Sequence, residues 1–158
     1  FALFGIVFAF TVKNLAYSLP ALILYAGLVI NTYFSIRCFS SITPEKNKMA
    51  NTVDIGLGVL YFLLASAFNN IQNFLMIALF LFELAAVKYS MLLRVSAPEY
   101  RNLVQKKILI DMLGVISCSL ALTFTLLGYS SYSIWSLALL LLAANIYLII
   151  VRPFYRID

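Results

Sequence analysis

Long uninterrupted runs of apolar residues alternate along this chain with short polar stretches. Several of the runs approach or exceed the ~20 residues that an α-helix needs to cross about 30 Å of hydrocarbon. They lack the strict two-residue alternation that is typical of the strands of a membrane β-barrel. The pattern therefore predicts an all-α integral membrane protein, with a bundle of five to six transmembrane helices that form a single polytopic domain over residues 1–158.

Prolines and polar residues divide the runs into helices. Pro20, Pro44 and Pro98 stand near expected helix starts, where the missing N–H of proline costs no hydrogen bond, and Arg152-Pro153 ends the last run. The first apolar run is too short to span a bilayer and is interpreted as part of a helix. The predicted helices cover residues 1–12 (partial), 19–38, 44–68, 71–94, 98–128 and 134–152.

Composition agrees with a membrane protein. Apolar residues make up 64% of the chain and the mean hydropathy is +1.01, which is more apolar surface than a soluble domain of 158 residues could hide from water. The chain has no histidine, so the usual zinc sites and serine nucleophiles activated by histidine are excluded. We expect no cofactor.

Positive charges lie mostly on one predicted side of the membrane. The positive-inside rule then predicts that loops 38–50 and 95–107 and the C-terminus are cytoplasmic. Because the net charge of +5 comes from cations at the ends of apolar runs, it does not indicate nucleic-acid binding. Nine of the eleven cations fall on the predicted cytoplasmic side: Arg37, Lys46, Lys48, Arg94, Arg101, Lys106, Lys107, Arg152 and Arg156.

The helices are expected to form three tandem hairpins, of which the last two share a pattern. Leu84-Ala85-Ala86 precedes Arg94 at the spacing by which Leu142-Ala143-Ala144 precedes Arg152. This correspondence suggests an internal repeat. Chance similarity in a chain so rich in Leu and Ala is the alternative.

Glu83 lies close to the middle of the 71–94 helix. An ionised carboxylate at the bilayer centre costs on the order of 3 kcal/mol, so the side chain has to be protonated, paired or next to a cavity. Glu83, Ala86 and Ser90 share a helix face that is small and polar enough for an interhelical contact, and we expect Glu83 to point into the bundle. It is either a ligand or ion site, or a protonated residue that serves packing.

Three further polar residues within the spans are candidates for the same ligand or ion site: Lys88, Asn31 and Asn145. Each has a structural alternative. Lys88 is close enough to Arg94 for its long side chain to reach the cytoplasmic surface. The two asparagines could simply hydrogen-bond neighbouring helices.

Asp54 and Asp111 lie just inside the predicted cytoplasmic interface, each on a stripe of small residues that includes Gly58 or Gly114. Two such carboxylates could hold a divalent cation for phosphate chemistry on a lipid. Lys107, however, stands four residues before Asp111 and can neutralise it. We therefore treat the pair as a possible cation site and do not expect an enzyme. The glycines are expected at helix contacts.

These residues indicate a transporter, or the membrane component of one, with a ligand or ion site near Glu83. The alternative is a non-catalytic structural or assembly subunit of a larger membrane complex, and a lipid enzyme using Asp54 and Asp111 is a third hypothesis. The expected partners are the lipid bilayer, other membrane subunits or a second copy of the chain, and a small solute or ion. No motif is specific enough to indicate a family.

Overall fold

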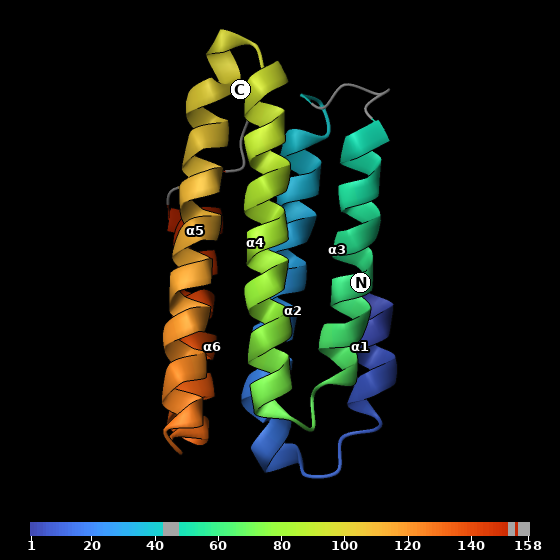
Figure 1. Ribbon diagram of the computed structural model, residues 1–158, viewed down its shortest axis with the longest axis vertical. Coiled ribbons are helices and arrows are strands. Elements are labelled where there is room, and N and C mark those ends of the chain that lie inside the picture. Colours follow the sequence, from blue (N-terminus) through green and yellow to red (C-terminus); the bar gives the residue numbers. More distant parts are fainter. Residues whose placement is uncertain (43–47, 152–153, 155–158) are drawn as a thin grey trace.

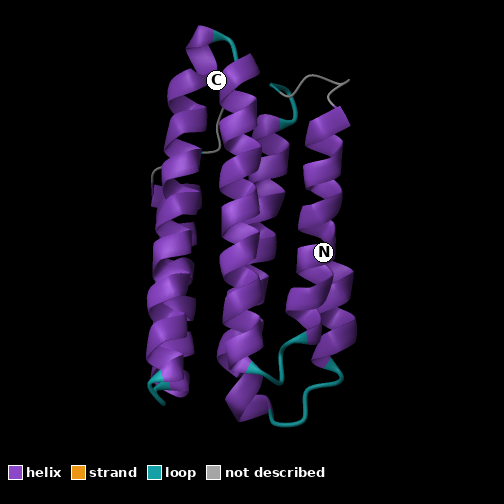
Figure 2. Cartoon of the chain, in the orientation of Figure 1, coloured by secondary structure: helices purple, strands orange, loops and turns teal. Residues whose placement is uncertain are grey.

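The computed structural model describes residues 1–42, 48–151 and 154, with residues 48–50 described by their backbone alone. Within these residues every regular element is a helix, and short loops join the helices (Figure 2). In chain order the elements are α1 (Ala2–Ala9), α2 (Leu15–Phe39), α3 (Lys48–Ser66), α4 (Ile71–Val95), α5 (Pro98–Leu126), α6 (Ser130–Ile146) and a π-helical turn, η1 (Tyr147–Val151).

Asparagine caps explain where α2 and α4 begin. The side-chain oxygen of Asn14 accepts a hydrogen bond from the backbone N–H of Tyr17, and Asn70 does the same for Asn73. Each cap satisfies one of the N–H groups that a helix start leaves without a partner. As a result α2 begins four residues before its predicted start, and Pro20 lies inside the helix instead of at its first position.

The predicted starts of α4 and α5 are confirmed, whereas α6 begins at Ser130, four residues earlier than expected. Gly128 ends α5 with a positive φ of 94°, a conformation that glycine adopts without strain. The N–H groups of Gly128 and Tyr129 bond back to the carbonyls of Thr125 and Phe124, which closes the helix. The start predicted at Pro44 for the third helix lies outside the described residues.

The helices form a ring around a common interior. Along this ring α3 packs on α4, α4 on α5, α5 on α6, and α6 on α2, while α1 contacts both α2 and α3 (Figure 1). Helices adjacent in the chain are therefore mostly neighbours in space, and the contact between α2 and α6 closes the ring. The interior is filled by large apolar side chains, among them Tyr61, Leu64, Phe68, Phe74 and Leu75.

Many large apolar side chains lie on the outer surface of the bundle. Along α5, for example, Leu109, Leu113, Ile116, Leu120 and Phe124 are all more than half exposed. An apolar exterior around an apolar core is the arrangement expected of helices surrounded by lipid. Four helices are long and apolar enough to cross a membrane: α2, α4, α5, and α6 together with η1.

The membrane bundle is thus supported, but five to six spans are not confirmed. Helix α1 has only eight residues, and the apolar part of α3, Asn51–Ser66, is shorter than the four candidate spans. The internal repeat is not confirmed either.

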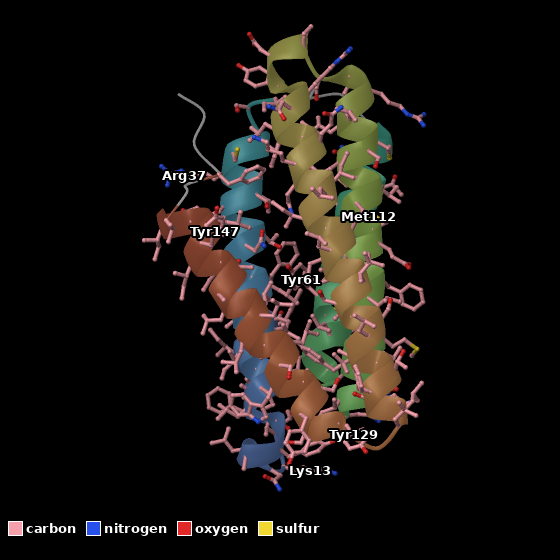
Figure 3. The ribbon with its side chains drawn as sticks, turned by 90° about the vertical axis from the view of Figure 1, so that its left-hand side faces the viewer. Lys13, Arg37, Tyr61, Met112, Tyr129 and Tyr147 are labelled. Carbon is pink, nitrogen blue, oxygen red and sulfur yellow. The ribbon has the colours of Figure 1, made fainter. Side chains whose placement is uncertain are left out.

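The two ends of the bundle carry the connections that the sequence predicts for them. Lys13 and Tyr129 lie at one end and Arg37 at the other (Figure 3). The last turn of α2, the first turn of α3 and the α4–α5 connection share the Arg37 end, which we call the α4–α5 end (Figure 1). Which side of the membrane this end faces remains a prediction.

One of the two expected glycine contacts is confirmed. A Cβ atom at Gly114 on α5 would overlap the ring of Phe82 on α4, so glycine permits the close packing of these two helices. At Gly58 a Cβ would meet only Phe1, at an ordinary distance of 3.8 Å. The close approach expected at Gly58 is therefore not found.

Candidate functional site: a charged cavity inside the ring

A cavity of about 380 Å³ lies inside the ring, in the half of the bundle nearer the α4–α5 end. This volume is typical of sites that bind small molecules. Helices α2, α3, α4 and α5 contribute to its wall, together with Phe1. Four of the lining residues have acidic or basic side chains: Asp54, Lys88, Lys107 and Asp111.

The first ion pair joins two helices. The ammonium group of Lys88 on α4 donates a hydrogen bond to Oδ1 of Asp54 on α3, with an N–O distance of 2.5 Å. The side chain of Lys88 is 17% exposed and that of Asp54 is 49% exposed. This pair is therefore the more accessible of the two charge pairs in the wall.

The second ion pair lies within α5 and is almost fully buried. Lys107 donates a hydrogen bond to Oδ1 of Asp111, one turn further along the helix, as their spacing predicts. The two side chains are 5% and 2% exposed. The other carboxylate oxygen of Asp111, Oδ2, is buried and accepts no hydrogen bond within the described part of the chain.

Tyr89 on α4 brings the two pairs together. The ammonium nitrogen of Lys107 lies 5.1 Å from the centre of the Tyr89 ring, and that of Lys88 lies 5.9 Å from it. Both distances are within the range of cation–π attraction. The two pairs thus gather around a single aromatic ring.

Hydrogen bonds between α2 and α3 form the deeper wall of the cavity. The hydroxyl of Tyr61 on α3 donates to the backbone oxygen of Leu28 at 3.0 Å and lies 2.5 Å from the hydroxyl of Thr32. Since the hydrogen of Tyr61 is directed to Leu28, Thr32 is the donor to Tyr61. Tyr61 lies in the interior of the bundle (Figure 3). On the same stretch of α2, Ser35 donates to the side-chain oxygen of Asn31.

Four of the six residues that the sequence singled out line this one cavity: Asn31, Asp54, Lys88 and Asp111. Asn145 does not, because its side-chain nitrogen donates to the backbone oxygen of Gly27 at 2.8 Å and joins α6 to α2. The interhelical role that was the alternative for Asn145 is therefore the one observed.

The expectation that Glu83 points into the bundle is wrong. Glu83 is exposed, whereas Phe82, Ala86 and Tyr89 on the same helix are buried. The small-residue face used to orient it runs along the border between the inner and outer sides of α4, since Ala86 is buried but Ser90 is exposed. Glu83 therefore lies outside the cavity.

Lys107, Tyr61 and Tyr89 are cavity residues that the sequence reasoning did not assign to a site. The positive-inside rule counts Lys107 among the cations of a cytoplasmic loop. Its spacing contained a signal, because Lys107 follows Val104 by three residues and precedes Asp111 by four, and all three are buried on one helix face. No feature of the sequence distinguishes Tyr61 and Tyr89 as cavity residues from the other aromatic residues of the helices.

The charges of the cavity balance, which restricts what it can bind. Each carboxylate is already paired with an ammonium group, so a divalent cation would have to displace a lysine from each. Calcium and magnesium also require six or more oxygen ligands, and the described residues contain no group of three or more His, Cys, Asp or Glu side chains that could hold a metal ion. The arrangement suits an organic ligand better than a bare metal ion.

The fold and the composition define the class of this protein, a helical multi-pass membrane protein with an internal polar cavity. No protein-family model matches the chain, and comparisons with curated proteins and with solved structures find no match either.

Proposed function

We propose that this chain is a small transport protein, or the membrane component of a transporter, and that its ligand site is the charged cavity between α2, α3, α4 and α5. The observation that carries the proposal is the presence of two lysine–aspartate pairs in the wall of a cavity of about 380 Å³ inside a membrane bundle. Ionisable side chains are costly at membrane depth and mark solute or ion pathways when they face a cavity.

Packing alone is a poor explanation for these charges. Replacing a buried ion pair by apolar residues of similar volume is often neutral or stabilising, so a bundle that only had to fold would gain nothing from Lys107 and Asp111. The charged groups also line a volume that a small solute can occupy.

Uptake by proteoliposomes tests the proposal. Liposomes containing the purified protein are incubated with a defined mixture of amino acids, amines, carboxylates, sugars and nucleosides, and their contents are measured by mass spectrometry. We expect at least one solute to accumulate above the level in empty liposomes. Ala85→Trp should abolish this uptake, because Ala85 lines the cavity and indole would fill it.

Val87→Trp is the matched control, since Val87 lies two residues away on α4 and is half exposed on the outer surface. It should retain uptake. If no solute accumulates with the wild-type protein, or if both tryptophan variants behave alike, the cavity is not a transport site.

Glu83 favours a second candidate function, that of a subunit in a larger membrane assembly. It stands in an exposed stripe of α4 at alternating spacings of four and three residues, a pattern typical of helix-to-helix seams. A carboxyl group on a lipid-facing surface is costly unless a neighbour donates a hydrogen bond to it, which a helix of another chain could do. The stripe consists of Met76, Phe80, Glu83, Val87 and Ser90.

Photo-crosslinking in native membranes tests this second function. A photoreactive amino acid at Val87 should capture a membrane protein, whereas one at Leu109, which is 61% exposed on α5, should capture lipid alone. Equal capture of protein from both positions, or from neither, would argue against a specific assembly surface at Glu83.

A further inference from the structure

The buried oxygen Oδ2 of Asp111 has no hydrogen-bond donor among the described residues. Asp111 is 1% exposed, its Oδ1 is bound by Lys107, and no described residue donates to Oδ2. A buried charged acceptor without a partner carries a large desolvation penalty. Because Asp111 is among the residues that line the cavity, a molecule inside the cavity can supply this donor once the carboxylate turns toward it. That molecule has to offer N–H or O–H groups, and an ammonium group meets the negative charge best.

Lys88 offers the opposite charge in the same wall. Its ammonium group has three hydrogens, one of which is directed to Asp54, and Asp54 is half exposed. A ligand carboxylate can therefore share Lys88 with Asp54 or replace it. The lost contact with Asp54 costs little, because ion pairs that are open to solvent are weak.

Charge balance selects between possible ligands. The two lysines and two aspartates cancel, so a ligand that carries a single charge would leave that charge uncompensated beside the buried Lys107–Asp111 pair. A ligand with one positive and one negative group keeps the net charge of the site at zero, and each of its charged groups finds a partner of opposite charge. The deeper wall contains Leu28, Leu81 and Phe82, which leaves room for an apolar substituent.

We infer that the cavity binds a zwitterion of the amino-acid class, with its ammonium group at Asp111, its carboxylate at Lys88 and an apolar side chain toward Leu81 and Phe82. This inference rests on the proposal that the cavity is a ligand site, and it names the chemical class of the ligand.

A matched set of ligands tests the inference on the unaltered protein. L-Leucine is compared with isoamylamine, which lacks only its carboxylate, and with 4-methylpentanoate, which lacks only its ammonium group. L-Alanine and L-phenylalanine are included so that side-chain size does not decide the result. Binding is measured by ligand-dependent thermal unfolding of the purified protein in detergent. We expect at least one amino acid to bind about 10- to 100-fold more tightly than either half-molecule, as expected for the loss of one charge-assisted hydrogen bond.

Protein variants test the assigned contacts. Asp111→Asn removes the charge expected to hold the ammonium group but leaves Lys107 unpaired, which endangers folding. The double variant Lys107→Met with Asp111→Leu removes both charges and should fold, because apolar replacement of a buried pair is tolerated. We expect it to lose amino-acid binding by a similar factor. Glu83→Gln is the control, since Glu83 lies outside the cavity.

The results separate this inference from the proposed function. Isoamylamine or 4-methylpentanoate binding as tightly as the amino acids would overturn the inference, and so would the absence of binding by all three amino acids. If proteoliposomes then take up a solute of another class, transport through the cavity stands and only the zwitterion is wrong. If the amino acids bind but nothing accumulates, the ligand class stands and transport is wrong.

Discussion

Lys107 and Asp111 lie one helical turn apart on α5, and their side chains form an ion pair that is almost completely withdrawn from solvent. The pair neutralises two charges that the interior of a membrane bundle could not hold separately. It leaves one carboxylate oxygen of Asp111 to which no residue in the described part of the chain donates. The pair thus makes the burial of both charges tolerable and gives the wall of the cavity its polarity.

Removing only the lysine should be far more damaging than removing both partners. In Lys107→Met the Asp111 carboxylate remains buried without its counter-charge, and we expect the free energy of unfolding to fall by about 3–5 kcal/mol. The double variant Lys107→Met with Asp111→Leu should recover most of this loss. Denaturant unfolding in mixed micelles measures both. If the double variant is as unstable as the single one, the pair does not act as a unit.

Replacement by asparagine should be tolerated at Asp54 but not at Asp111. Asp54 is half exposed, so its pair with Lys88 is screened by solvent, and Asp54→Asn should cost no more than about 1 kcal/mol. Asp111→Asn, tested under identical conditions, should cost several times as much because Lys107 stays buried. Equal losses at the two positions would show that their environments are alike, as an internal repeat requires.

Gly114 should be more sensitive to enlargement than Gly58. A methyl group at Gly114 would overlap the ring of Phe82, and overpacking of this kind typically costs about 1–3 kcal/mol. At Gly58 the added methyl meets an ordinary contact, so Gly58→Ala should change stability little and serves as the control. Thermal unfolding of the two alanine variants makes the comparison. A smaller side chain at Phe82 should relieve the loss at Gly114.

Glu83 should be dispensable for ligand binding. Because its side chain is exposed on the outer face of α4, Glu83→Gln and Glu83→Leu should leave amino-acid affinity unchanged at every pH at which the protein is folded. Isothermal titration of the wild-type protein and both variants provides the test. A loss of affinity in Glu83→Gln alongside normal folding would return Glu83 to the ligand site.

The predicted topology can be tested by labelling in intact cells. With Cys38 and Cys118 replaced by serine, single cysteines at Asn70 and Ser131 should react with a membrane-impermeant reagent, because the positive-inside rule places these turns outside. A cysteine at Arg101 should react only after the cells are permeabilised. Labelling of all three positions in intact cells would reject the model of topology.

The sequence by itself determined the class of the protein, most of its helices and the Lys107–Asp111 contact. These are local properties. Whether a segment can span a bilayer depends on its own length and apolarity, and an i,i+4 pair meets on any regular helix. Helix ends were less certain wherever a short-range cap such as Asn14 competed with a proline as the apparent start.

Only the tertiary structure decided which helix faces turn inward. In water, polar residues mark the outer face of a helix, but lipid and the interior of a bundle are both apolar, so hydropathy does not distinguish the two sides of a spanning helix. The sequence therefore predicted that Glu83 faces the interior of the bundle, whereas in the fold it lies on the outer surface. The meeting of Lys88 with Asp54, 34 residues away, depends on how α3 and α4 pack, and that packing also creates the cavity.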